Sequence, residues 1–355
     1  MFNSTYHVVG VMSGTSLDGI DLAELKLIRQ NDCWHYQILA CETVSYAAFW
    51  LNKLKAAVNF SDEALKQLNF EYTQLLGETI LNFIKKHDLT HLDAICSHGH
   101  TILHQPQNGI TLQIGNLPDL SKIVQQKVVC NFRIQDVQLG GQGAPLVPVG
   151  DALLFGKYTY CLNLGGFSNI SFQENNQRVA FDIAPVNTVL NYFSNQLGFE
   201  FDNKGTLSKS GTLHLKLLNK LNEMAFYQKK HPKSLGIEFV NSKVMPILNS
   251  FAGSCEDKMR TFTEHTAFQI AKALPTQEGI LLATGGGVYN TFLMERIGFY
   301  LPKMTVEIPD SKLLEYKEAL IFGLLGVLKL RGEINIFQSV TGASKNHCSG
   351  VVFDY

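Results

Sequence analysis

The pattern of hydrophobic and polar residues repeats one arrangement twice along the chain. An apolar, β-branched run at Tyr6–Met12 leads into small and polar residues at Ser13–Gly19, and a similar run at Tyr160–Leu164 leads into a glycine turn. Apolar runs of this length, bounded by turn residues, predict strands. In each half a second strand follows the turn, and a third strand-like segment comes after it, at 34–44 in one half and at 179–185 in the other. We therefore expect a three-stranded meander at the start of each half.

Helical spacing follows each predicted meander. Ser61 suits an N-cap, Asp62 and Glu63 favour a first helical turn, and apolar residues recur at helical spacing from Leu65 to Ile84. Further helices are expected over about 187–197, 213–221, 261–274, 290–297 and 315–330, and short strands over 92–96, 112–114, 128–130 and 280–284. Three strands followed by alternating helix and strand are typical of a ribonuclease-H-like lobe, which makes the fold class α/β.

The length of 355 residues favours two such lobes over one core. We expect an N-terminal lobe of residues 1–132 plus about 340–355, a C-terminal lobe of residues 133–339, and a cleft between them. Two small-residue turns that face each other across this cleft could hold phosphates from both sides.

Composition narrows the classes of partner. The chain is 45% hydrophobic, its formal net charge is −1 and no Lys/Arg block appears, which argues against nucleic acid and an anionic membrane surface. The start lacks a secretory pattern, and the longest apolar run, Ala319–Leu328, is too short to span a bilayer. Seven scattered cysteines without a C-x-x-C pair argue against disulfides and structural zinc. We expect a soluble cytoplasmic protein with a small substrate; the oligomeric state stays open, with a homodimer among the options.

The first turn, Ser13–Gly19, combines glycines with hydroxyl side chains. Gly14 and Gly19 allow backbone N–H groups to approach an anion, and the hydroxyls add donors in the same turn. Asp18 and Asp21 add carboxylates that suit Mg²⁺ or its water shell beside a polyphosphate. On spacing alone an ordinary hairpin is equally compatible.

The strand predicted at 92–96 leads into Ser97-His98-Gly99-His100-Thr101-Ile102-Leu103-His104. A transition-metal site is disfavoured because no acidic or thiol ligand is adjacent, and a hydrogen-bonded histidine cluster is the simpler alternative. Arg133 follows in Asn131-Phe132-Arg133 and could bind a carboxylate or phosphate, or form a surface ion pair with Asp136.

The second half contains a carboxylate and two further glycine turns. Asp182 lies where an apolar strand ends and a helix begins, so it could act at a cleft or cap the helix. The second-lobe turn presents Asn163, Gly165 and Gly166 as candidates. Gly285-Gly286-Gly287 and Asn290 join a strand to a helix, which indicates close approach of a ligand or tight packing. Glu318 begins the last helix and could contact a substrate or stabilise the helix dipole.

The string Gly14–Asp21 resembles the opening phosphate motif of the anhydro-N-acetylmuramic acid kinases, in the superfamily of sugar kinases, actin and heat-shock ATPases. Gly140–Pro148, Phe181-Asp182, Glu318-Ala319 and Val340–Ala343 are similar to further family strings, in the family's order. The resemblance therefore covers nearly the whole chain, from Gly10 to Ala343.

The chain departs from the family pattern at several positions. His100 stands where these kinases have glutamine, Asn131 where they usually have aspartate, and Ile237 where they have arginine. The small residues between Asp182 and Asn187 also differ, at Ile183, Ala184 and Val186. These changes leave the substrate contacts open.

The resemblance implies a cytoplasmic ATP- and Mg²⁺-dependent kinase of cell-wall (peptidoglycan) recycling. It would open 1,6-anhydro-N-acetylmuramic acid with water and phosphorylate O6, with Asp182 as the general base. The implied ATP-binding residues are Gly14, Thr15, Ser16, Leu17, Asp18, Gly19, Ile20, Asp21, Asn163, Gly165, Gly166, Gly285, Gly286, Gly287 and Asn290. The implied substrate-binding residues are His98, His100, Thr101, Arg133 and Glu318. Asp18 and Asp21 would hold Mg²⁺ directly or through water. The alternatives are a kinase of the same fold acting on another sugar or acid, and a nucleotide-binding module without chemistry.

Overall fold

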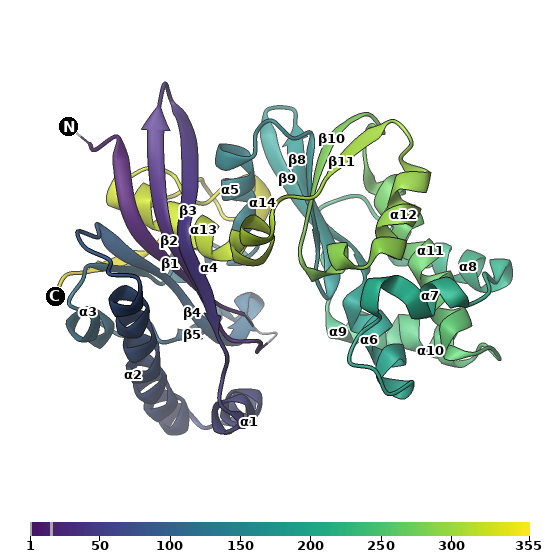
Figure 1. Cartoon of the computed structure of the whole chain (residues 1–355), viewed down its shortest axis with the longest axis horizontal. Helices are drawn as coiled ribbons and strands as arrows, with labels where there is room; N and C mark the ends of the chain where they lie inside the picture. The colour runs from purple at the N-terminus through teal and green to yellow at the C-terminus, as the bar shows by residue number, and fades with distance from the viewer. Residues whose placement is uncertain (1, 15–16) are drawn as a thin grey trace. The chain divides into compact units, whose positions relative to one another are not determined.

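The computed structural model describes residues 2–14 and 17–355. The chain forms two compact units, one of Met1–Leu154 with Glu315–Tyr355 and one of Phe155–Leu314, which we call the first and second unit (Figure 1). The boundaries expected from the sequence lie near residues 132 and 340 instead. They differ because α5 (Val147–Leu154) packs against β3 (Cys33–Val44), and because α13 (Ser311–Leu330) packs on the first sheet from Glu315 onward.

The sheet of the first unit has the order β12-β6-β4-β1-β2-β3, with β5 paired to β4. The first three strands form an antiparallel meander, and β4 and β6 run parallel to β1. Besides β3, the strands of this sheet are β1 (Thr5–Ser13), β2 (Ile20–Gln30), β4 (Ala94–Gln105), β5 (Ile110–Ile114), β6 (Val128–Cys130) and β12 (Val351–Phe353).

The sheet of the second unit has the order β11-β10-β7-β8-β9. Its first three strands are again an antiparallel meander, and β10 and β11 run parallel to β7. The strands are β7 (Tyr160–Leu164), β8 (Phe167–Glu174), β9 (Gln177–Pro185), β10 (Gly279–Thr284) and β11 (Met304–Glu307). The order and direction of β6-β4-β1-β2-β3 in the first sheet thus match those of β11-β10-β7-β8-β9 in the second, and β5 and β12 are additions to the first. The prediction of an α/β fold built from two ribonuclease-H-like lobes is confirmed.

Helices accompany both sheets. The first unit contains α1 (Ala48–Ala56), α2 (Asp62–Lys86), α3 (Asp119–Val124), α4 (Ile134–Gln138), α5, most of α13 and α14 (Gln338–Thr341). The second contains α6 (Asn187–Gln196), α7 (Thr206–Ser210), α8 (Leu215–Asn222), α9 (Ile237–Phe239), α10 (Met245–Asn249), α11 (Cys255–Ala273) and α12 (Thr291–Tyr300). Shorter helical turns are η1 (Ala57–Asn59), η2 (Pro106–Asn108), η3 (Asn203–Gly205), η4 (Ala225–Gln228), η5 (Val240–Val244) and η6 (Gly286–Tyr289).

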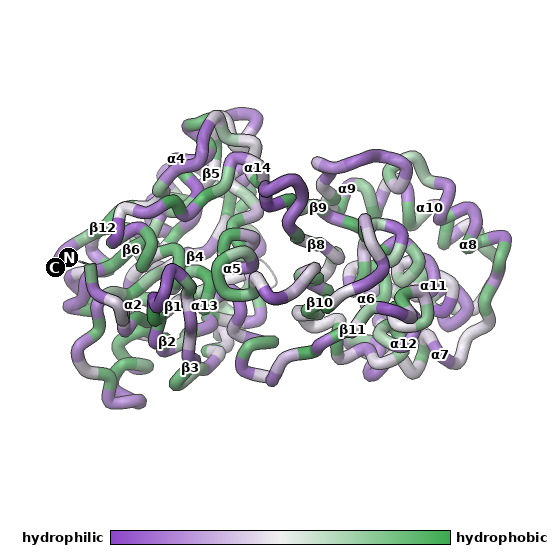
Figure 2. The backbone as a smooth tube through the Cα atoms, turned by 90° about the horizontal axis from the view of Figure 1, so that it is seen from above, coloured by the Kyte–Doolittle hydropathy of each residue, from purple (hydrophilic) through white to green (hydrophobic). Residues whose placement is uncertain are grey.

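Helix α13 is central to the first unit. Its run from Ala319 to Leu328 is hydrophobic (Figure 2), and the apolar side chains of this run are buried. It meets β1 at Gly10, where a Cβ atom would lie 2.0 Å from the carbonyl oxygen of Ala319. Any larger residue at Gly10 would push helix and strand apart, so this glycine sets their spacing.

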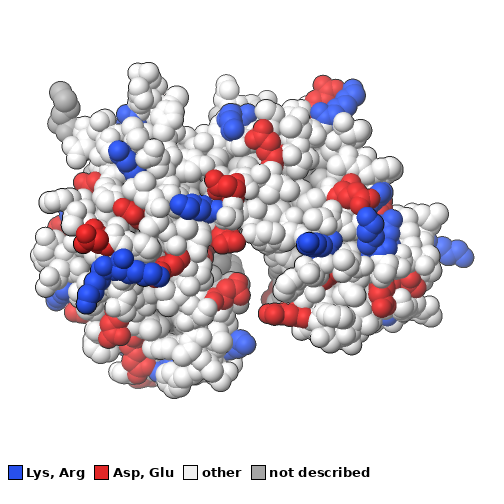
Figure 3. Space-filling view, viewed as in Figure 1, with Lys and Arg blue, Asp and Glu red and all other residues white. Residues whose placement is uncertain are grey.

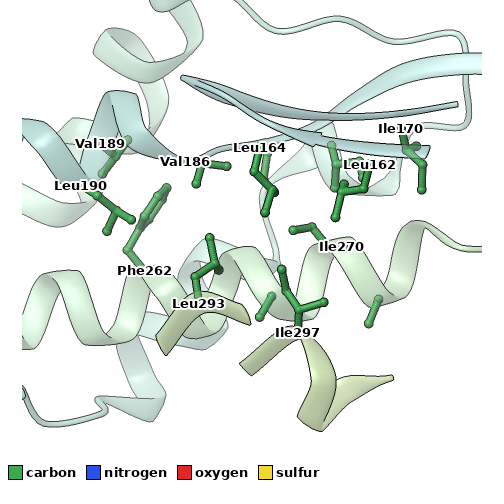
Figure 4. Packing of buried hydrophobic residues seen from close by; sticks show 14 of the residues in the cluster. Leu162, Leu164, Ile170, Val186, Val189, Leu190, Phe262, Ile270, Leu293 and Ile297 are labelled. Carbon is green, nitrogen blue, oxygen red and sulfur yellow. The ribbon is translucent and has the colours of Figure 1, made fainter. Parts of the chain in front are cut away.

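The core of the second unit lies between its sheet and the helices α6, α11 and α12. Figure 4 shows Leu162, Leu164 and Ile170 of the meander facing Phe262 and Ile270 of α11, together with side chains from α6 and α12. The apolar spacing of these helices places such residues on one face, and the core forms where that face meets the sheet.

Three predicted elements differ in extent. The predicted strand at 92–96 continues as β4 to Gln105, so the histidines lie within a strand. Helix α11 begins at Cys255, where Ser254 caps it and Glu256 and Asp257 lie in the first turn, rather than at residue 261. Helix α13 begins at Ser311 and departs from helical geometry at Tyr316, close to the predicted start.

On the face shown in Figure 3, acidic and basic residues are interspersed within each unit. In the described part of the chain, no helix has the length and hydropathy needed to cross a membrane.

Candidate functional site

The first small-residue turn joins β1 to β2. Leu17 adopts a left-handed conformation, with φ of 64°, and its N–H donates to the Gly14 carbonyl at 3.2 Å. Ile20 is 1% exposed and belongs to the core, so it shapes the turn from inside. Gly19 packs against the backbone of Val44, where a Cβ atom would lie 2.6 Å from the carbonyl oxygen. Thr15 and Ser16 lie outside the described residues.

An acidic group adjoins this turn. Asp21 accepts a hydrogen bond from Thr43 Oγ1 at 2.6 Å. Burial raises the pKa of Asp21, and the neighbouring carboxylates Asp18 and Glu315 raise it further. Such mutual repulsion would be relieved by a cation. In the described residues, no three His, Cys, Asp or Glu side chains are placed to hold a metal together.

Ser13, at the end of β1, is the centre of a buried polar network. Its Oγ lies 2.8 Å from His100 Nδ1 and 2.6 Å from the hydroxyl of Tyr46, which in turn lies 2.5 Å from that of Tyr72. His100 is 2% exposed, and burial lowers its pKa to about 4. The imidazole is therefore neutral at pH 7 and faces the protein interior, where it supports the strand that precedes the turn.

His98, within β4, and Arg133, directly before α4, form a second polar pair. Arg133 Nε donates to His98 Nε2 at 2.9 Å, and its Nη1 donates to the Gly143 carbonyl at 2.6 Å. Since His98 Nε2 accepts, the proton lies on Nδ1, which donates to the Gly99 carbonyl at 2.8 Å. Burial and the adjacent guanidinium both lower the pKa of His98. Arg133 therefore bonds to His98 and to the Gly143 carbonyl, and the alternative of a surface ion pair with Asp136 is wrong.

Glu318 provides the charge that balances Arg133. Its side chain is solvent-accessible, yet the surrounding protein desolvates it enough to raise its pKa, and Arg133 is the largest opposing influence. Desolvation lowers the pKa of Arg133 to about 10, and Glu318 counteracts this most strongly. Two opposite charges that are coupled without a direct hydrogen bond could both bind a polar ligand.

The remaining residues of the histidine run have ordinary partners. Thr101 accepts a weak hydrogen bond from Gln113 on the adjacent strand β5, at 3.4 Å. His104 lies 3.1 Å from the hydroxyl of Thr111, also on β5. Each histidine in the run thus has its own protein partner, which fits the hydrogen-bonded alternative better than a shared metal.

Asp182 lies near the end of β9 in the second unit. Its N–H donates to the Lys233 carbonyl at 3.1 Å, and its Oδ2 accepts from the N–H of Leu235 at 2.8 Å. Burial raises its pKa, and the bond from Leu235 offsets this in part. Helix α6 begins at Asn187 without a side-chain cap, so Asp182 does not act as its N-cap. A half-buried carboxylate with one backbone donor is suited to accept a proton.

The two glycine turns of the second unit lie side by side. A Cβ atom on Gly285 would lie 2.6 Å from Asn163 Oδ1, and one on Gly287 would lie 2.7 Å from the Cβ of Leu164. Tight packing therefore explains these two glycines. At Gly286 a Cβ atom would meet nothing within 4 Å, so its backbone borders open space that a ligand could enter.

The other candidates of these turns have local roles. Gly165 N–H donates to the Phe167 carbonyl, and the Gly166 carbonyl accepts from Thr188. Asn290 is 7% exposed and caps α12, with its Oδ1 accepting from Leu293 N–H at 2.9 Å. A cap of this kind fixes the start of the helix after the glycine turn.

Several polar residues beside the candidate site were missed by sequence reasoning. Tyr72 reads as an apolar position of a helix, and its hydroxyl partner lies 59 positions away at Ser13. Lys317 forms a buried ion pair with Asp151 at 2.8 Å, next to Glu318. A lysine inside an otherwise apolar helical stripe is the one sequence signal that could have pointed to this pair.

The sequence is similar to known proteins over nearly its whole length. A family model described as "Anhydro-N-acetylmuramic acid kinase" matches residues 6–355. A protein of that name from Pseudomonas syringae pv. syringae (strain B728a) is 33% identical over 365 residues, covering 98% of this chain and 99% of the relative. One from Actinobacillus pleuropneumoniae serotype 5b (strain L20) is 32% identical, covering 97% and 98%.

Solved structures show a more distant similarity. Component A of (R)-2-hydroxyglutaryl-CoA dehydratase from Acidaminococcus fermentans has 13% sequence identity and a TM-score of 0.45, with 92% of this chain and 99% of that chain covered. At this level the similarity says nothing about substrate.

Proposed function

Because the chain belongs to the anhydro-N-acetylmuramic acid kinase family, we propose that it opens 1,6-anhydro-N-acetylmuramic acid with water and transfers the γ-phosphoryl group of ATP to O6. The products would be N-acetylmuramic acid 6-phosphate and ADP. The enzyme class, a phosphotransferase acting on an alcohol group, follows from the family. The water step and the residue roles are our proposal.

Asp182 is the proposed general base, and the environment of its carboxylate is the observation that carries the mechanism. It would take a proton from the water that attacks the anomeric carbon, while the bond from that carbon to the bridging oxygen breaks. The released O6 then accepts the phosphoryl group. Burial raises the pKa of Asp182, which makes its carboxylate a better base than that of an ordinary aspartate.

The first unit supplies the proposed sugar contacts. Arg133 and Glu318 offer a guanidinium and a carboxylate that could bind the sugar's carboxylate and hydroxyl groups. Both ring nitrogens of His98 already have protein partners, so His98 would hold Arg133 in position. His100 would act in the same indirect way through Ser13, which removes the reason to expect an altered substrate from its exchange with glutamine.

The proposed nucleotide contacts fall in both units. Backbone N–H groups of the Gly14–Gly19 turn and the N–H of Gly166 would bind phosphates, and Gly165, whose N–H donates to the Phe167 carbonyl, would shape the second turn. The open backbone at Gly286 would face the adenosine. Asp18 and Asp21 would hold Mg²⁺ through water, and the ion would neutralise charge on the phosphates.

Incubation with ATP, Mg²⁺ and the anhydro sugar tests the proposal, with the products identified by mass spectrometry. We expect the sugar to gain one water and one phosphoryl group. A phosphorylated sugar without added water would contradict the hydrolytic step. Turnover of a different sugar or acid alone would favour the kinase of altered substrate, and ATP binding without any turnover would favour a nucleotide-binding module.

A further inference from the structure

A basic pocket lies in the second unit, apart from the residues assigned above. Its volume is about 230 Å³, and four lysines line it: Lys229, Lys230, Lys233 and Lys272. Three of them, with His231, fall within five consecutive positions, and the fourth comes from the end of α11. This concentration is unusual in a chain whose 30 basic and 31 acidic residues nearly balance.

The positive charge of this pocket is only partly compensated. In the described residues, the carboxylate that pairs with the cluster is Glu174, which lies 3.3 Å from His231 Nε2. Lys272 Nζ donates to the neutral side chain of Gln228 at 3.4 Å. Lys233 lies over the rings of Phe226 and Phe181, at 4.8 and 5.7 Å from their centroids. Burial and the charge of Lys272 both lower the pKa of Lys233, so the cluster repels itself.

Tyr227 belongs to the lining of this pocket and is 5% exposed. In the described part of the chain its hydroxyl has no hydrogen-bond partner, and the oxygen is buried rather than open to the cavity. Tyr227 therefore forms part of the wall, and the lysines supply the charge that an anion would contact.

We propose that this pocket binds a small dianion of the phosphate class, either orthophosphate or the phosphoryl group of a sugar phosphate. Lysine ammonium groups bind phosphate as point charges, and several around one cavity favour a dianion over a single carboxylate. The volume is below the range of roughly 300–1,000 Å³ that is typical of pockets for larger ligands, which argues against a whole nucleotide.

The pocket is connected to Asp182 through the backbone. Phe181 and Ile183 line it, and because successive side chains of a strand point to opposite faces, Asp182 points away from it. The segment after the lysines nevertheless contacts Asp182, through the Lys233 carbonyl and the Leu235 N–H. An anion that fixes residues 229–233 therefore also fixes the segment that positions Asp182. This coupling rests on the proposed function; the binding itself does not.

Amine acylation of the whole protein, mapped by mass spectrometry, tests the location. We expect orthophosphate to protect Lys230 and Lys272 from acylation, while Lys216 and Lys220 on α8 of the same unit react unchanged. The protection should persist with saturating ADP and Mg²⁺, because the proposed nucleotide site lies elsewhere. Protection that ADP abolishes, or that is equal at all four lysines, would overturn the proposal. Glucose 6-phosphate in place of orthophosphate shows which source binds more tightly.

Calorimetric titration with orthophosphate tests the chemistry. The double variant Lys230→Gln/Lys272→Gln should bind about 100-fold more weakly, since each lost charge-assisted bond corresponds to roughly a tenfold change. The control Lys216→Gln/Lys220→Gln should bind like the unmodified protein. Equal affinity of the first variant and the control would refute the site, whatever the result for sugar turnover.

Discussion

The two units share a strand order but use their interior carboxylates differently. In the first unit, Asp136 is fully buried and accepts from Gly143 N–H and Thr341 Oγ1, each at 2.7 Å, with His347 Nε2 at 3.5 Å. In the second, Asp182 is half-buried and accepts from Leu235 N–H, and burial raises its pKa. A carboxylate whose oxygens are satisfied holds a loop together, whereas one with spare acceptor capacity can take a proton.

The strongest test of this contrast is Asp182→Asn. We expect sugar turnover to fall about 10²- to 10⁴-fold, because an amide cannot act as a general base. ATP binding and stability should be retained, since the amide oxygen can still accept from Leu235. Steady-state turnover, nucleotide titration and urea unfolding measure the three effects. Glu200→Gln, an exposed acid of the same unit, is the matched control. Turnover of Asp182→Asn within tenfold of the control would show that another group is the general base.

The same substitution at Asp136 should have the opposite effect. Asp136→Asn turns one acceptor into a donor that faces an existing donor, so the free energy of unfolding should fall by about 2–3 kcal/mol. Urea unfolding at pH 7 measures this, with Thr341→Val as a partial variant that removes one of the two bonds. An unchanged midpoint would show that Asp136 is not the structural carboxylate of the pair.

Asp21 is a carboxylate of the first unit for which we propose a role in binding Mg²⁺. Asp21→Asn should raise the Mg²⁺ concentration for half-maximal turnover about 10- to 100-fold, the range typical of residues that act through bound water. Glu78→Gln, an exposed acid on α2, should leave it unchanged. Equal Mg²⁺ dependence of both variants would contradict a metal role for Asp21.

Substitution of His100 should have a smaller effect, on the pH dependence of stability. Its folded-state pKa of about 4 lies below the unfolded value of about 6.5, so the unfolded state binds the proton first and stability falls as pH drops through this window. Between pH 7 and pH 5 the free energy of unfolding of the wild type should fall by about 2 kcal/mol more than that of His100→Gln, in which this group is absent.

Urea unfolding of both proteins at pH 7 and pH 5 measures the difference. The glutamine can still bond Ser13, so turnover at pH 7 should change only a few-fold. An identical pH dependence of wild type and variant would mean that His100 titrates normally and is not held in the interior.

The sequence predicted the elements that rest on local patterns. Both meanders, the capped helix α2 and the position of Asp182 at a strand end follow from periodicity and turn residues over short windows. Helix α5 was missed because Pro145, Pro148 and Gly150 indicate a loop, and β4 was predicted too short because Gly99 interrupts its apolar run.

Other features depend on residues far apart in the chain. The bond between Asp136 and Thr341 spans 205 positions, and the network around Ser13 joins three separate elements. Local periodicity contains no information about such partners. It therefore could not show that His100 faces inward while Arg133 and Glu318 are coupled across the first unit.

The most direct test of the central claim compares Asp182→Asn with the unmodified protein in one reaction mixture of ATP, Mg²⁺ and the anhydro sugar, followed by product mass. We expect the unmodified protein to yield a sugar heavier by one water and one phosphoryl group, and the variant to bind ATP but to yield almost none of this product. Equal yields of that product from both proteins would contradict the central claim.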